Sequence, residues 1–208
     1  ILDMHAVPGC QNPDWHSDSE GAVLFWREEK YREEYVELWG KLSRVFKNEE
    51  LIAGYDIMNE PVTDDVSLLQ ESYARVIKAV RENNDKHIIF LEGNFYAQKV
   101  EMLKELIGEN VALSIHFYEP VKFTFNEVPG YSYPGIIEGQ RWDKNEIRRR
   151  LEVYTIYNAP VYAGEFGVAA NRNRGELNWV KDVLSLFNEF GFHFTYWTYK
   201  SIAPMQLP

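Results

Sequence analysis

The chain has 208 residues, a length that suits one globular domain, so we expect a single domain over residues 1–208. Its 32 acidic residues outnumber the 22 Lys and Arg residues and give a formal net charge of −10. Nucleic-acid and anionic membrane surfaces both need clustered positive charge, so this balance argues against either partner. No apolar stretch approaches the roughly 18 residues of a membrane span. The single cysteine, Cys10, excludes an intrachain disulfide and a cysteine-cluster metal site.

Six short apolar runs along the chain are predicted to be β-strands. Each is rich in Ile, Val, Phe and Tyr, and its apolar residues are continuous rather than alternating. Strands of this kind have both faces buried, as in a parallel sheet. The runs are Ile1–His5, Leu51–Met58, His87–Glu92, Val111–Tyr118, Pro160–Glu165 and His193–Trp197.

Amphipathic helices are predicted between these strands, because apolar residues recur there at intervals of three and four. The stripes are Tyr31, Tyr35, Leu38, Leu42 and Val45; Leu69, Tyr73, Val76 and Val80; Ile147, Leu151 and Tyr154; and Leu177, Val180, Leu184 and Phe187. Asp143 and Glu146 predict a capping box at the start of the third helix. A shorter helix is expected over residues 97–107. Residues 119–142 are expected to form a long loop with several aromatic side chains, and loops of that length are usually functional.

The alternation of strands and helices predicts an α/β fold with a mainly parallel sheet. An open doubly wound sheet and a (β/α)8 barrel both fit this pattern. No glycine-rich phosphate loop follows a strand, which removes the main signature of nucleotide-binding open sheets. Polar residues instead follow the carboxyl ends of the strands, where a barrel has its active site. We therefore predict an incomplete (β/α)8 TIM barrel with about six strands and five helices.

Two glutamates, Glu60 and Glu165, stand at the ends of predicted strands. Pro61 stops the strand directly after Glu60, and Gly164 and Gly167 flank Glu165 so that a ligand can approach the backbone closely. A charged residue at the end of a buried strand is costly unless it is paired or used. Two structural carboxylates in salt bridges are the alternative. Two opposed carboxylates are also what acid-assisted cleavage of a glycosidic bond needs, because one protonates the leaving oxygen while the other attacks or assists attack.

Five motifs follow one another along nearly the whole chain. They are the opening Leu2–Asn12, Asn59-Glu60-Pro61, His116-Phe117-Tyr118, Gly164-Glu165-Phe166-Gly167 and Trp197. In their order and spacing they resemble glycoside hydrolase family 5, the cellulase-like enzymes of clan A. The resemblance implies a retaining β-glycosidase that hydrolyses β-linked glucan as endoglucanases do. It also implies a β-linked oligo- or polysaccharide as partner, no cofactor, and secretion.

The same resemblance implies roles for individual residues. Glu60 would be the general acid/base and Glu165 the nucleophile, with carboxyls roughly 5–5.5 Å apart as retention requires. Asn59 would bind the sugar 2-hydroxyl, Tyr118 would donate a hydrogen bond to Glu165, and Trp197 would stack on the sugar.

Other candidates carry equally plausible structural alternatives. His5 and His116 would position the acid and the sugar hydroxyls, although a lone histidine near a strand end is often structural. Trp15 and His16 could line a minus subsite, and Trp142 with the aromatics of residues 119–142 could wall the plus side; a packed loop aromatic is the alternative for each. Glu92 matches no catalytic position of the family, so we expect a salt bridge there. His5, His16 and His116 lack metal-ligand spacing, so no catalytic metal is expected.

The chain departs from the family pattern at both ends. The family normally has two βα units before the Ile1 strand, an arginine that braces the nucleophile, and a last helix. Sheet edges left without these units invite pairing with another chain, so we expect a homo-oligomer that completes the barrel. A smaller or distorted closed barrel, and a longer parent protein that supplies the missing units, are the alternatives. A catalytically impaired carbohydrate-binding barrel is the alternative function. A barrel isomerase or aldolase is a third, with Lys200 alone as candidate lysine.

Overall fold

The computed structural model describes residues 1–127, 129–169 and 173–198. The chain divides into two compact parts, a first part of residues 1–114 and a second part of residues 115–208. Among the described residues, no helix is both long and apolar enough to cross a membrane.

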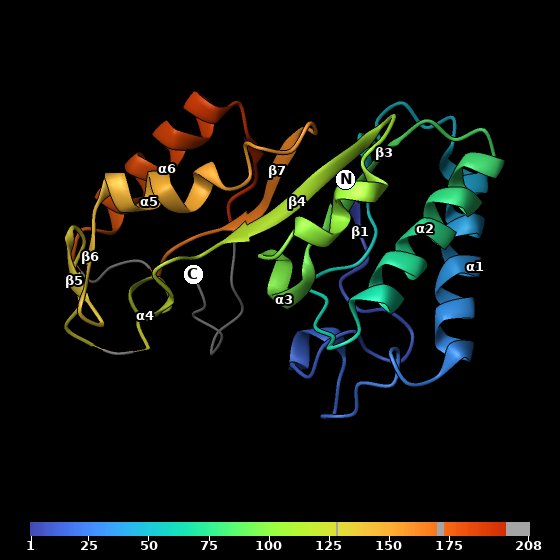
Figure 1. The fold of residues 1–208 in the computed structure, drawn as a ribbon, viewed down its shortest axis with the longest axis horizontal. Coiled ribbons are helices and arrows are strands. Elements are labelled where there is room, and N and C mark those ends of the chain that lie inside the picture. Colours follow the sequence, from blue (N-terminus) through green and yellow to red (C-terminus); the bar gives the residue numbers. More distant parts are fainter. Residues whose placement is uncertain (128, 170–172, 199–208) are drawn as a thin grey trace. The chain divides into compact units, whose positions relative to one another are not determined.

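The first part contains four parallel strands in chain order (Figure 1). They are β1 (Leu2–Asp3), β2 (Gly54–Asp56), β3 (Ile88–Glu92) and β4 (Val111–Phe117), and the last residues of β4 belong to the second part. Leu2 pairs with Tyr55 and Ile89 with Val111. All residues of β4 are buried, as expected of a strand covered on both faces. The predicted parallel pairing is therefore confirmed, although β1 and β2 are shorter than the apolar runs that predict them.

Two long helices, α1 (Glu29–Phe46) and α2 (Val66–Glu82), pack side by side in the first part (Figure 1). The Asp65 side chain begins α2 by accepting hydrogen bonds from the amides of Ser67 and Leu68. The predicted stripe of α2 is confirmed, because all of its residues are buried: Leu69, Tyr73, Val76 and Val80.

The buried face of α1 differs from the predicted one. Leu38 and Val45 of the predicted stripe are 38% and 72% exposed, whereas Tyr35 and Trp39 are buried. The Tyr35 hydroxyl and the Trp39 indole nitrogen both donate to the Ile57 carbonyl at 3.0 Å. The spacing of apolar residues does not reveal such hydrogen bonds. These bonds fix which side of α1 faces the sheet.

The segment after β3 is not the predicted helix of residues 97–107. It starts with a four-residue turn, α3 (Asn94–Ala97), in which Phe95 and Tyr96 have left-handed φ values of 59°. A 3₁₀ helix, η2 (Glu101–Leu106), follows. Asn94 fixes the turn, since its side chain accepts from the Thr63 amide at 3.0 Å and donates to the Thr63 carbonyl at 2.8 Å.

The second part continues β4 and adds two parallel strands, in the order β4-β7-β8. They are β7 (Val161–Phe166) and β8 (His193–Phe194), paired at Tyr162 with His193. Both residues of β8 are exposed, contrary to the predicted strand with two buried faces; among the described residues, β8 has one neighbouring strand, β7. Six parallel strands among the described residues, separated by helices, agree with the predicted α/β class.

Residues 119–142 contain more regular structure than the predicted loop. A short helix, α4 (Val121–Thr124), precedes an antiparallel hairpin of β5 (Gly135–Ile137) and β6 (Gln140–Trp142). Phe123 and Tyr133 are buried, and the Tyr133 hydroxyl donates to Asp182 Oδ2 at 2.7 Å. Much of the aromatic content of this segment is therefore core.

Helices α5 (Lys144–Glu152) and α6 (Glu176–Phe190) pack together in the second part (Figure 1). Asp143 caps α5 as predicted, since its side chain accepts from the amides of Asn145 and Glu146. The Glu146 carboxylate accepts from Arg149 and Arg150 on α5. The predicted stripe of α5 is buried: Ile147, Leu151 and Tyr154.

The buried face of α6 is again turned relative to the predicted stripe. Leu177 is 74% exposed, whereas Trp179 and Val183 are fully buried. The Trp179 indole nitrogen donates to the Glu119 carbonyl at 3.0 Å. As in α1, a hydrogen-bonded tryptophan that the stripe omits sets the inward face.

Candidate active site

Glu60 lies shortly after β2 in the first part, and its main chain is held on both sides. Its amide donates to Glu92 Oε2 at 2.6 Å, and its carbonyl accepts from Asn12 Nδ2 at 2.9 Å. Its φ is +47°, a left-handed value that is uncommon for a residue other than glycine. These contacts hold Glu60 in a strained turn directly before Pro61.

The loop after β1 also supports this turn, through the side chain of Gln11. Gln11 is fully buried, and its Nε2 donates to the carbonyls of Asn59 at 2.7 Å and His5 at 2.9 Å. The Asn59 side chain is itself 2% exposed, and its Nδ2 has no hydrogen-bond partner among the described residues. A buried amide donor of this kind is suited to a ligand hydroxyl.

His16, on the 3₁₀ helix η1 (Trp15–Ser17), approaches the Glu60 carboxylate, with Nε2 3.4 Å from Oε2. Its ring lies edge-on to that of His5, with centroids 5.7 Å apart, and the His5 Nδ1 is 2.9 Å from Asp3 Oδ2. Trp15 is 61% exposed and lies edge-on to His16. The structure therefore gathers His5, Trp15 and His16 on the Glu60 side of the first part.

Glu165 lies near the end of β7 in the second part, and its side chain is held by two residues of β4 and the loop after it. The Tyr118 hydroxyl donates to Glu165 Oε2 at 2.6 Å, and His116 Nδ1 is 3.6 Å from the same oxygen. The side chains of His116 and Glu165 are only 3% and 13% exposed. The Tyr118 hydroxyl therefore fixes the orientation of a nearly buried Glu165 carboxylate.

The two candidate tryptophans of the second part have different environments. Trp197 is 37% exposed, and its amide donates to the Phe166 carbonyl at 2.9 Å, next to Glu165 along the chain. Trp142 is 5% exposed, and the Arg150 guanidinium lies 5.1 Å from its ring. We correct the interpretation of Trp142 as a wall of the plus side, because its ring is packed in the core of the second part.

Three site residues were not predicted as such: Gln11, Asn12 and Glu92. Gln11 and Asn12 belong to the opening motif, but nothing in the spacing of residues indicates that their side-chain amides are buried. Glu92 was expected in a salt bridge; the structure shows its carboxylate on the Glu60 amide. Its place at a strand end, after four apolar residues, is the signal that could have found it. Lys200, the candidate for Schiff-base chemistry, lies outside the described residues.

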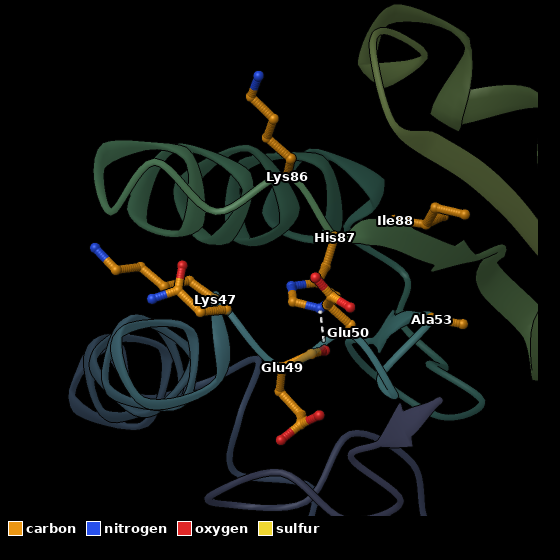
Figure 2. A pocket seen from close by; sticks show the side chains of 8 residues that line it. Lys47, Glu49, Glu50, Ala53, Lys86, His87 and Ile88 are labelled. Atoms are coloured by element: carbon orange, nitrogen blue, oxygen red, sulfur yellow. Dashed lines mark hydrogen bonds between the residues drawn. The ribbon is translucent and has the colours of Figure 1, made fainter.

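A hollow of about 460 Å³ lies at the amino ends of β2 and β3 (Figure 2). His87 points into it, with Nε2 3.1 Å from the Glu49 carbonyl and Nδ1 2.6 Å from Asp85 Oδ1. The Tyr55 hydroxyl donates to the other Asp85 oxygen at 2.8 Å. These bonds tie the loop before β2 to the start of β3. A barrel enzyme has its site at the carboxyl ends of its strands, so we assign this hollow to the support of the fold.

The parallel strands, the helices between them and the glutamates at the carboxyl ends define the class as (β/α)8 type. The family model Cellulase (glycosyl hydrolase family 5) matches residues 1–202, so the chain belongs to glycosyl hydrolase family 5. The prediction of this family, and of an incomplete (β/α)8 barrel, is therefore confirmed.

Individual relatives support the same assignment. A β-xylosidase of Phanerodontia chrysosporium is 30% identical over 98% of this chain and 45% of its own length. Endoglucanase C of Acetivibrio thermocellus is 24% identical over 97% of this chain and 68% of its own. The solved structure of an endoglucanase matches with a TM-score of 0.73 and 27% identity, over 86% of this chain and 62% of its own. The chain thus spans about half to two thirds of their length, and is similar to glycoside hydrolases of the cellulase type.

Proposed function

We propose that the chain carries the catalytic residues of a retaining β-glycosidase that hydrolyses β-linked glucan. Glu165 acts as the nucleophile and Glu60 as the general acid/base. The hydrogen bond from Tyr118 to Glu165 is the observation that carries this proposal, because it fixes the orientation of a nearly buried carboxylate at the end of a strand. Family membership supports the reaction class.

In the first step a Glu165 oxygen attacks the anomeric carbon, and the bond from that carbon to the leaving oxygen breaks. Glu60 gives its proton to the leaving oxygen, so the product departs as an alcohol. Tyr118 and His116 both face Oε2, which assigns the attack to Oε1. The result is a glycosyl ester on Glu165 and an ionised Glu60.

In the second step Glu60 takes a proton from water, and the resulting hydroxide attacks the anomeric carbon. The ester bond breaks, Glu165 returns to its carboxylate, and the sugar keeps its β configuration. The buried Asn59 amide donates to the sugar 2-hydroxyl, a hydrogen bond that strengthens in the transition state. Trp197 stacks on the apolar face of the sugar, as its exposure allows.

The experiment is covalent trapping of the nucleophile. The chain is incubated with 2,4-dinitrophenyl 2-deoxy-2-fluoro-β-cellobioside, whose fluorine slows the second step more than the first. We expect the intact mass to rise by one fluorocellobiosyl group, with the label on the peptide that contains Glu165. The variant Glu165→Ala should gain no label. A label on another carboxylate would overturn the assignment.

A carbohydrate-binding barrel without turnover is the second candidate, because an exposed ring such as Trp197 can bind a sugar without cleavage of any bond. It predicts oligosaccharide binding with neither trapping nor release of product. The names of the relatives, a β-xylosidase and endoglucanases, suggest the panel of substrates: aryl β-xyloside, aryl β-cellobioside and soluble β-glucan.

We also propose that the chain self-associates, and that it works outside the cell, where a polymeric glucan is found. The strands β1 and β8 are the first and last in the strand order, and each has one neighbour among the described residues. Open parallel edges favour pairing with a second copy. Light scattering after gel filtration should give a dimer or larger species; a monomer at all concentrations would contradict self-association.

A further inference from the structure

Glu92 is a buried carboxylate that the two-step mechanism does not use. It ends β3 and is 1% exposed. Burying an ionisable group in this way is costly, so such groups are usually hydrogen-bonded. The acceptor Oε2 of Glu92 lies 2.6 Å from the amide nitrogen of Glu60, the proposed acid/base.

The main chain of Glu92 is itself rigidly held. Glu92 pairs in register with Ser114 of β4, and its carbonyl accepts from the Tyr73 hydroxyl of α2 at 2.9 Å. At the next residue, Gly93, an added Cβ would lie 2.2 Å from the Lys99 carbonyl oxygen, so the chain turns there without room to shift. Glu92 therefore extends from a fixed strand end toward the Glu60 turn.

The Glu60 turn needs such a support. A φ of +47° is unfavourable for a residue with a side chain, and it persists only where neighbouring groups enforce it. Glu92 takes the amide of Glu60, and Asn12 donates to its carbonyl. The direction of the Glu60 side chain follows from this main-chain geometry, since the Cα–Cβ bond is fixed by φ and ψ.

We propose that Glu92 is a positioning residue for the acid/base: by accepting the Glu60 amide it holds the left-handed turn that aims the Glu60 carboxyl at the leaving oxygen. This inference rests on the proposed role of Glu60. Glu92 does not touch the substrate, and it acts on the transfer of the proton rather than on the attack by Glu165.

The test compares Glu92→Gln, which keeps an oxygen acceptor for the amide, with Glu92→Leu, which removes it at similar size. The readout is kcat/KM for phenyl β-cellobioside, whose leaving group needs protonation, relative to 2,4-dinitrophenyl β-cellobioside, whose leaving group does not. We expect Glu92→Leu to lower this ratio by about tenfold or more, within the range that general acid catalysis provides. Glu92→Gln should retain the ratio within about threefold.

The matched control is Asp85→Asn, which changes another fully buried carboxylate of the same part at the far end of the strands. It should lower stability without changing the ratio between the two substrates. Equal loss on both substrates in Glu92→Leu, or a failure of Glu92→Gln to retain the ratio, would overturn the positioning role.

A second measurement does not depend on turnover. Hydrogen exchange of the Glu60 amide, followed by NMR on ¹⁵N-labelled protein, should be slow in the wild type and in Glu92→Gln, and fast in Glu92→Leu. If the wild type cleaves no substrate, the proposed function fails, while this exchange still decides whether Glu92 holds the Glu60 amide. Fast exchange in the wild type would overturn it.

Discussion

The two proposed catalytic glutamates are held by different parts of the residue: Glu60 by its main chain and Glu165 by its side chain. Glu60, in the first part, is held through its main chain by Glu92 and Asn12, and a histidine approaches its side chain. Glu165, in the second part, lies near the end of a regular strand and is held through its side chain by Tyr118.

This difference matches the different tasks of the two groups. A nucleophile must keep its charge and present one oxygen, and a hydrogen bond to the carboxylate serves both needs. An acid/base must gain and lose a proton in each cycle. The bonds from Glu92 and Asn12 act on the Glu60 amide and carbonyl, so they can hold the turn in either protonation state of its carboxyl.

The largest loss of activity is expected when the proposed nucleophile is removed. Glu165→Ala removes the proposed nucleophile, so release of phenol from aryl β-cellobioside should fall by about 10⁴-fold or more. Glu152→Ala, an exposed carboxylate on α5, is the control and should retain full activity. A Glu165→Ala variant with a tenth of wild-type activity would show that another group attacks.

The next effect is at the acid/base. Glu60→Ala should lower kcat/KM for phenyl β-cellobioside by about 10²- to 10⁴-fold, because the leaving oxygen is no longer protonated. The loss on 2,4-dinitrophenyl β-cellobioside should be much smaller. Equal losses on the two substrates would argue that Glu60 supports the fold rather than the proton transfer.

Tyr118→Phe isolates the side-chain support of the nucleophile. Hydrogen bonds to charged groups are worth about 1.5–3 kcal/mol, so kcat should fall by about 10- to 150-fold. Tyr133→Phe removes a comparable bond to a carboxylate, that of Asp182, in the same part. Tyr133→Phe should lower the free energy of unfolding and leave kcat unchanged. If it lowered kcat as much as Tyr118→Phe does, the special role of Tyr118 would be refuted.

Smaller effects on stability are expected at two matching helix caps, Asp65 of α2 and Asp143 of α5. Each side chain accepts from two backbone amides, so replacement by Ala should lower the free energy of unfolding by about 1 kcal/mol. The two caps share no partner, and the double variant should therefore lose the sum of the two. Urea unfolding followed by circular dichroism measures these free energies. A double variant whose loss differs clearly from the sum of the two single losses would contradict the prediction.

The smallest effect concerns acid stability through Asp85. Burial alone would raise its pKa, but hydrogen bonds from the His87 amide, the Tyr55 hydroxyl and the His87 ring outweigh burial and lower the pKa below 3.8. The stabilisation is therefore present above pH 3.8 and is lost as pH falls through the lowered folded-state value. Asp85→Asn should flatten the dependence of unfolding free energy on pH in this acid range. An unchanged slope would contradict the shift.

Sequence reasoning was most successful where a residue type has one physical use. Continuous apolar runs gave the parallel strands, and Asp143 gave the cap of α5. The predicted faces of α1 and α6 were only partly right: Tyr35 and Phe187 are buried as predicted, but the stripes omit Trp39 and Trp179. Hydrogen bonds to distant carbonyls place these two tryptophans, and periodicity does not register such bonds. The prediction that Trp142 forms a wall of the plus side was wrong because the sequence of a long segment does not show which of its aromatic residues are buried.

The site shows the same division. Glu60 and Glu165 stand at strand ends in recognisable motifs, so the sequence points to them. Gln11 and Glu92 act through main-chain atoms of residues 48 and 32 positions away, at Asn59 and Glu60. Only the folded topology brings those atoms together, and no local spacing predicts it.

The histidine beside the acid offers a practical route for engineering. His16 lies 3.4 Å from the Glu60 carboxylate, but neither of the bonds that anchor the Glu60 main chain comes from it. Substitutions at position 16 can therefore change the surroundings of the Glu60 carboxylate while the two hydrogen bonds to its main chain are kept. The same freedom does not exist beside Glu165, where Tyr118 orients the carboxylate through a hydrogen bond to the side chain itself.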